Sequence, residues 1–399
     1  MRMIVVGFIV GSLAVPLGAA ESPLVEQYLH SGDLARGEQV LEAALMARPE
    51  DDQIRFGLGV LQFVRGVERL GQSLYEYGCR SENANAPFLR LPVPKNPDPS
   101  PITYSALRRV LDGFHHDLGV AETTLAAIKA DDVTLRLRLS DVRFDVTGNG
   151  KATERLSEIL KRLMGRVPPA LAENPDFQVC FDRGDVAWLR AYCHLLMAMI
   201  DIQLALDGET LFNLSADELF ARPEHPFTGT PDEKREQLWE SWGCVVVKEP
   251  ARLGRFRQHL MQVCALNRET WKHIRAEQDN DYEWLPNSKQ KGVIGLPVTD
   301  AMIDAWLGMV DEVEAVFDGR KMIPASIVQF FSPPAKKGLN LKLVLDDPPA
   351  KFDWNKLRSD PPADKYLDRT RPDMNLIAFL RVTGVFQNSL GVAYAVWFN

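Results

Sequence analysis

The 399-residue sequence has no basic tract, and its formal net charge at pH 7 is −8, because 54 acidic residues outnumber 46 lysines and arginines. Proteins that bind nucleic acid by neutralising phosphates carry the opposite excess. The charge therefore argues against a nucleic-acid partner. The apolar and charged fractions, 46% and 25%, are those of an ordinary folded chain.

The sequence also lacks the short motifs that mark common enzymes. It contains no G-x-S-x-G nucleophile elbow, no H-E-x-x-H zinc motif, no Walker loop and no dinucleotide-binding fingerprint. No motif therefore favours nucleophilic catalysis or a nucleotide cofactor.

Cysteine is scarce, with five residues in the chain. An odd number leaves at least one thiol free or paired with another chain. No C-x-x-C occurs, so a redox motif or a zinc ribbon has no support. Cys193 and Cys264 fall on apolar helical faces, whereas one disulfide among Cys79, Cys180 and Cys244 stays open.

Residues 1–20 have the pattern of a secretory signal peptide. A weakly positive start precedes an apolar run at residues 4–17, and small side chains follow at 18–20. We expect cleavage after Ala20, a mature chain that begins at Glu21, and export to the periplasm or the extracellular space. The run is too short to span a membrane comfortably, so no transmembrane segment is expected in the mature chain.

Residues 185–206 form a helix-length block that is apolar on nearly every face and contains neither proline nor glycine. Such a helix packs inside other helices or inside lipid. Asp185 is expected to cap its start and Gly208 to end it. We therefore predict a mainly α fold, in which a multi-helix body surrounds this buried central helix.

Three ionisable residues of the central helix, Arg190, His194 and Asp201, fall on one narrow stripe at about 100° per residue. Buried ionisable groups are unfavourable unless they are paired. The stripe is thus either a polar network closed by partners elsewhere in the fold or the lining of a site. In the second case these three are the candidate catalytic residues.

Two further histidines lie side by side at His115 and His116. Adjacent positions point to different faces of a helix, so the pair cannot chelate one ion together, and we expect one to be buried and one exposed. His259, on the helix predicted near residues 253–278, is expected to be exposed or semi-exposed.

The first helices, at residues 21–77, resemble a tetratricopeptide repeat. The residues at the packing positions of that repeat are Leu24, Tyr28, Gly32, Leu34, Leu41, Ala44 and Pro49. Gly37 departs from the alanine that the repeat usually has, and the pattern fades after Gly66. The resemblance covers about one and a half repeats and implies a helical hairpin docked on the body, or else a peptide-binding array.

Residues 145–156 resemble the calcium loop of an EF-hand. Oxygen-bearing side chains recur at every second position and a glycine follows at the sixth. The resemblance implies a calcium site. Its ligands would be Asp145, Thr147, Asn149 and the carbonyl of Lys151, with Glu154 or Glu158 in place of the glutamate that Leu156 replaces. The alternative is a glycine-rich turn whose polar side chains only cap the next helix.

A small β element is expected at residues 133–144 and 177–181, the first because of its strict apolar and polar alternation. Residues 279–287 mix acids with Tyr282 and Trp284, which need a cover or a ligand such as a sugar or a cationic group. Prolines make the C-terminal region irregular, and its apolar end is expected to pack back on the core. The expected organisation is a signal peptide (1–20), a helical hairpin (21–78), a helical core (79–318) and a proline-rich region (319–399).

Two functions remain from the sequence. The first is an exported, non-catalytic helical binding or scaffold protein of the cell envelope, stabilised by calcium, with a protein partner. The second is a hydrolase that acts on an envelope polymer at a cleft near His194. They differ in whether the stripe on the central helix opens to solvent.

Overall fold

The computed structural model describes residues 24–84, 86–159, 176–327, 337–353, 364–386 and 398. The expected signal peptide, residues 1–20, lies outside the described residues. Within them the chain is mainly helical and adds small two-stranded antiparallel sheets, which confirms the predicted fold class.

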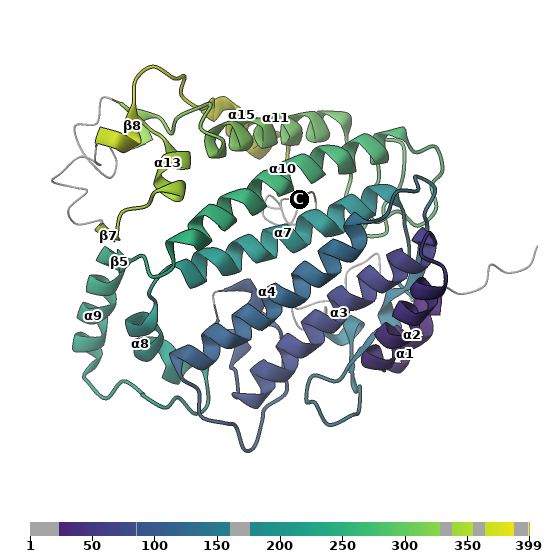
Figure 1. Ribbon diagram of the computed structural model, residues 1–399, viewed down its shortest axis with the longest axis horizontal. Helices are drawn as coiled ribbons and strands as arrows, with labels where there is room; N and C mark the ends of the chain where they lie inside the picture. Colours follow the sequence, from purple (N-terminus) through teal and green to yellow (C-terminus); the bar gives the residue numbers. More distant parts are fainter. Residues whose placement is uncertain are drawn as a thin grey trace, which may run out of the picture.

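Five long helices lie side by side in chain order and form the body of the molecule (Figure 1). They are α3 (Asp52–Glu76), α4 (Tyr104–Ala126), α7 (Arg183–Ala205), α10 (Pro250–Ala276) and α11 (Asp300–Phe317). Neighbours run antiparallel, as the contacts of α4 with α7 illustrate: Glu122 bonds to Arg190, whereas Arg108 bonds to the carbonyl of Leu204. The row places α7 between α4 and α10.

The central helix α7 is buried as predicted, with Val186, Ala191 and Cys193 fully shielded from solvent. Its start differs from the prediction. Asp182, not Asp185, is the N-cap, and Asp185 completes a capping box by accepting the backbone N–H of Asp182. The correction moves the beginning of the helix by two residues, because Asp182 satisfies the free N–H groups of the first turn.

The helices α1 (Leu24–Ser31) and α2 (Leu34–Ala47) match the predicted hairpin and turn at Gly32, whose φ is +74°. One apolar core joins Leu41 of this hairpin to Leu125 of α4 and Val186 of α7. The hairpin therefore packs on the body, whereas its kinship with tetratricopeptide repeats stays a prediction.

The predicted β element is present. Strand β1 (Leu135–Arg138) pairs antiparallel with β4 (Gln178–Phe181), and Leu137 lies opposite Val179. Strands β2 (Arg143–Phe144) and β3 (Glu154–Arg155) pair across the loop that resembles an EF-hand. The remaining strands are β5 (Cys244–Val246) with β7 (Lys351–Asp353) and β6 (Gly338–Leu339) with β8 (Leu367–Asp368).

Shorter helices complete the described chain. They are α8 (Glu209–Leu219), α9 (Pro231–Gly243), α13 (Leu341–Asp346) and α15 (Leu376–Val385), with 3-10 turns at η1 (Ser81–Asn83), η2 (Pro87–Arg90), η3 (Leu139–Asp141) and η4 (Asp364–Tyr366). Phe398 is fully buried against Trp271, as expected for an apolar C-terminal end that packs on the core.

Two properties of the described chain bear on its surroundings. None of the described helices combines the length and the apolar character that crossing a membrane requires. All five cysteines are unpaired, so the disulfide left open by the sequence does not form in this structure.

Candidate functional site

The three stripe residues of α7 face polar groups of both neighbouring helices. Arg190 donates its Nε–H to Oε1 of Glu122 on α4 at 3.0 Å, and His194 Nε2 lies 3.5 Å from the same oxygen. Asp201, which is fully buried, accepts hydrogen bonds at Oδ1 from Arg252 at 3.0 Å and from Arg255 at 3.4 Å. The stripe is therefore paired with groups on α4 and α10.

The other oxygen of Asp201 faces two histidines. Oδ2 lies 3.5 Å from Nε2 of His115 on α4 and 3.7 Å from Nε2 of His259 on α10. The ligand atoms of these three residues all lie within 4.8 Å of one another. We call His115, Asp201 and His259 the histidine–aspartate cluster.

Two atoms of the histidine–aspartate cluster are buried without a hydrogen-bond partner, namely Nε2 of His115 and Oδ2 of Asp201. A buried polar atom without a partner is unfavourable and uncommon in folded proteins. The two atoms lie 3.5 Å apart, the distance of an ion pair, and one group bound between them would give each a closer partner.

The spacing of these atoms suits a metal ion. In a tetrahedral zinc site with metal–ligand distances of about 2.1 Å, neighbouring ligand atoms lie about 3.4 Å apart. The separations of 3.5 Å and 3.7 Å around Asp201 are close to that value. Two imidazoles and one carboxylate leave a fourth position open, as in catalytic or exchangeable zinc sites.

The second ring nitrogen of His259, Nδ1, also has a partner of the kind that metal-bound histidines commonly have. Its Nδ1 lies 2.8 Å from Nδ1 of His194, and Nε2 of His194 points to Glu122. If His259 uses Nε2 as a ligand, its Nδ1–H donates to His194, and the Nε2–H of His194 faces the carboxylate. A metal-bound histidine commonly donates its second N–H in this way, which fixes its tautomer and orientation.

The ionisation states favour cation binding by the same atoms. Burial and then the neighbouring His194 lower the pKa of His259 to about 4, so the imidazole is neutral at pH 7. Burial raises the pKa of Asp201, but His115, Arg255 and Arg252 outweigh that effect and hold the pKa below its ordinary value. Asp201 is therefore a carboxylate.

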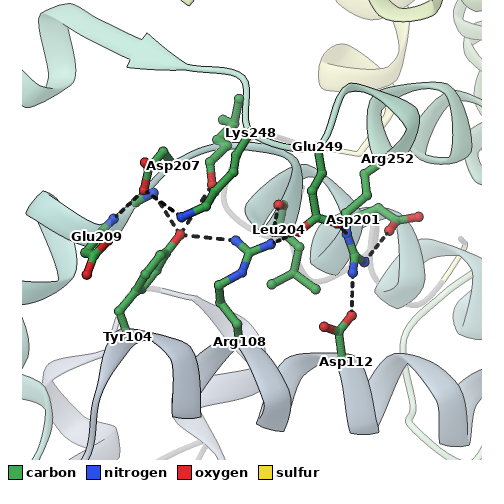
Figure 2. Close-up of polar contacts among 12 residues, drawn as sticks. Tyr104, Arg108, Asp112, Asp201, Leu204, Asp207, Glu209, Lys248, Glu249 and Arg252 are labelled. Carbon is green, nitrogen blue, oxygen red and sulfur yellow. Dashed lines mark hydrogen bonds and ion pairs between the residues drawn. The ribbon is translucent and has the colours of Figure 1, made fainter.

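An arginine network holds Asp201 in place. Figure 2 shows Arg252 among three carboxylates: it donates to Asp201 at 3.0 Å, to Asp112 at 2.6 Å and to Glu249 at 2.6 Å. Arg108 extends the network, because it bonds to Glu249 and to the carbonyl of Leu204. With Oδ1 of Asp201 bound by arginines, Oδ2 is left to face the histidines.

The stripe is neither sealed nor fully open. The side chains of His115, His259 and His194 are 23%, 16% and 12% exposed, whereas Asp201 is closed to solvent. The stripe thus belongs to a paired polar network between α4, α7 and α10, in which the histidine side chains are partly exposed and the carboxylate of Asp201 is buried.

The sequence analysis missed His115 and His259 as members of the site. His115 was expected only to differ from His116 in burial, and His116 is indeed exposed while His115 is half-buried. The sequence nevertheless contains a spacing that could have indicated these histidines. The pairs His115 with Glu122, His194 with Asp201, and Arg252 with His259 are each seven residues apart, which places both members on one helical face.

The residues of the loop that resembles an EF-hand lie elsewhere, at the end of the β2–β3 hairpin. Asp145 accepts the Thr147 hydroxyl at 3.1 Å and the backbone N–H of Gly150 at 2.6 Å, and Asn149 accepts the N–H of Lys151 at 2.9 Å. The side chains of Asp145, Thr147 and Asn149 thus form hydrogen bonds within the turn and stabilise it.

The outgoing end of this loop departs from the EF-hand pattern, in which a helix follows the loop. Glu154 belongs to β3, and Glu158 lies in the helical residues 156–159 with its side chain exposed. The strand pair β2–β3 replaces the first turn of the expected helix, because residues 154 and 155 bond across to residues 144 and 143.

Comparison with known proteins adds no relative. The chain matches no protein-family model, no curated protein and no solved structure. The functional argument therefore depends on the geometry of the site.

Proposed function

We propose that this chain is an exported helical binding protein of the cell envelope whose histidine–aspartate cluster binds one divalent transition-metal ion, with zinc as the reference ion. The single observation that supports this most strongly is the pair of unpartnered buried atoms, Nε2 of His115 and Oδ2 of Asp201, which face each other and His259. Imidazole ligands favour zinc, copper, iron and nickel over calcium or magnesium.

The metal proposal is tested by titrating the metal-free protein with Zn²⁺ or Co²⁺ in a calorimeter. The wild-type protein should bind one ion per chain. His115→Ala and His259→Ala each remove a ligand and should abolish or strongly weaken binding. His194→Ala removes only the partner of His259 and should weaken binding by about 10–100-fold.

The matched control is His116→Ala, because His116 neighbours His115 in sequence but is exposed and outside the cluster. It should bind as the wild type does. Circular dichroism checks that each variant keeps its helix content. Wild-type affinity in both ligand variants, or no binding by the wild type, contradicts the proposal.

A second candidate, a hydrolase of an envelope polymer, is favoured by one observation. The three ligands leave an open position, and the His194–Glu122 pair, which contacts the far nitrogen of the ligand His259, could accept or deliver a proton at Nδ1 of that imidazole. The two functions separate in an assay of the metal-loaded protein on an envelope polymer such as peptidoglycan. A catalytic centre requires turnover that His194→Ala slows without removing the metal.

The remaining expectations of the sequence are part of the same proposal. Export follows from residues 1–20, and calcium at Asp145, Thr147 and Asn149 would reinforce the β2–β3 turn. A protein partner is supported by α9, where Trp239 and Trp242 are 72% and 67% exposed. Large exposed aromatic side chains of this kind are frequent in binding surfaces.

A further inference from the structure

A group of acidic side chains gathers where the N-terminus of α7 meets the C-terminus of α10. Carboxylate oxygens of Asp182, Glu277 and Glu283 all lie within 4.8 Å of one another. Asp185 adds a fourth carboxyl group, whose Oδ2 accepts the backbone N–H of Asp182 at 3.1 Å. We call these four residues the carboxylate cluster.

The burial of the carboxylate cluster distinguishes it from an acidic surface patch. Asp185 and Glu283 are only 2% and 3% exposed. Oδ1 of Asp185 and Oε1 of Glu277 are buried and have no hydrogen-bond partner among the described residues. Oxygen atoms in that condition are unfavourable unless a ligand occupies the space that they face.

Burial, and after it the charge of neighbouring acids, raises the pKa values in the carboxylate cluster. Burial raises the pKa of Glu283 to about 7, and Asp182 adds to the rise. Burial and then the charge of Asp182 raise the pKa of Glu277, and burial, Asp182 and Glu283 raise that of Asp185. A cation among these oxygens would reverse the effect, because an ion becomes the largest local charge.

We propose that the carboxylate cluster binds a hard divalent cation of the calcium, magnesium and manganese class, held between α7, α10 and the loop that follows α10. These ions take several oxygen ligands, with carboxylates foremost. The histidine–aspartate cluster offers nitrogen ligands, so the two sites select different ions. Ion binding at the carboxylate cluster does not depend on a metal at the histidine–aspartate cluster, and metal binding there does not depend on the carboxylate cluster.

The loop that carries Glu283 is held firmly enough to form a site. Asn287 donates its side-chain N–H to the carbonyl of Ile274 at 2.9 Å, and the N–H of Val293 donates to the carbonyl of Glu283 at 2.8 Å. Glu277 is the C-cap of α10.

The experiment is a set of thermal melts on the chelator-treated full chain at neutral pH, without ions and with Ca²⁺, Mg²⁺ or Mn²⁺ in turn. At least one of these ions should raise the wild-type midpoint by about 2 °C or more at saturation. Glu277→Gln keeps the shape of the side chain but removes the carboxyl group that would bind an ion as a carboxylate. It should melt no lower than the wild type without ions and should lose the ion-dependent shift.

Two controls make the result specific. Asp279→Asn removes an exposed acid from the same loop, and Asp145→Ala removes the acid of the loop that resembles an EF-hand; both should keep the shift. The proposal is overturned if no ion shifts the midpoint of Asp145→Ala, or if the shift of that variant survives when Glu277→Gln is added to it. A shift that disappears in Asp145→Ala would assign the ion to the β2–β3 turn.

Discussion

At the scale of single residues, a buried glutamate that is fully hydrogen-bonded joins two segments that are distant in the chain. Glu26 on α1 is 4% exposed and binds Arg138 at the end of β1 three times: through the backbone N–H at 2.9 Å, Nε at 3.1 Å and Nη2 at 3.2 Å. Charge-assisted bonds of this kind are stronger than neutral ones. Burial raises the pKa of Glu26, but the bonds to Arg138 outweigh burial and leave the pKa below its ordinary value of 4.5.

Glu26→Gln should therefore destabilise the protein by about 1–2 kcal/mol at pH 7, the low end for a buried ion pair, since half-exposed Arg138 can return to water. A carboxylate with a lowered pKa contributes stability above its ordinary pKa and loses it as the pH falls through the lowered value. The difference between wild type and variant, measured by urea denaturation, should hence narrow below pH 4.5. Glu42→Gln, at an exposed position of α2, should show no such pH-dependent difference.

At the scale of elements, close helix contacts account for glycines that helix propensity alone would disfavour. Gly37 lies inside α2, where the tetratricopeptide repeat usually has alanine. A Cβ at this position would lie 2.6 Å from Cβ of Tyr28 on α1 and 2.9 Å from Cδ1 of Leu61 on α3. No side chain fits there without moving a neighbouring helix. Gly113 in α4 differs, because nothing lies within 4 Å of its added Cβ.

A comparison of Gly37→Ala with Gly113→Ala separates the effect of close packing on stability from the effect of helix propensity. Gly37→Ala should lower the free energy of unfolding by about 1–3 kcal/mol, because overpacking exceeds the gain in helix propensity. Gly113→Ala should raise it by about 0.5–1 kcal/mol. Equal effects of the two substitutions in chemical denaturation would contradict the tight α1–α2–α3 contact.

At the scale of the whole molecule, the C-terminal end is tied to the centre of the helical row. Phe398 is fully buried, and its ring centroid lies 4.6 Å from that of Trp271 and 5.1 Å from that of Phe386. Asn267 of α10 donates to its carbonyl at 3.3 Å. Phe398 thus fills the core beside α10 and α11.

Phe398→Ala should destabilise the protein by about 3–5 kcal/mol, the cost of emptying a large aromatic site in a core. The control is Trp239→Ala on α9, an aromatic side chain that is 72% exposed and whose loss should change stability by no more than about 0.5 kcal/mol. A guanidinium denaturation series compares the two. Similar small effects would mean that the chain end does not support the core.

One member of the histidine–aspartate cluster, Asp201, could be predicted from the sequence, but the other two and the chemistry of the cluster could not. Arg190, His194 and Asp201 were assigned to one stripe, because helical periodicity alone determines which residues of α7 share a face. His115 and His259 could not be assigned to the same site, because each lies on another helix. The local sequence does not indicate which faces of α4, α7 and α10 pack together. The carboxylate cluster could not be predicted either, because its members lie at a helix N-terminus, at the end of another helix and in a loop.

The sequence by itself determined the N-terminal helices, the long helices α7 and α10 with their approximate ends, the small β element and the burial of α7. These depend on local properties, namely apolar periodicity, capping residues and the positions of proline and glycine. Only the tertiary structure decided which ionisable groups meet. A buried charge takes its partners, its pKa and its ligand from side chains that are distant in the chain, so its role exists only once the helices have packed.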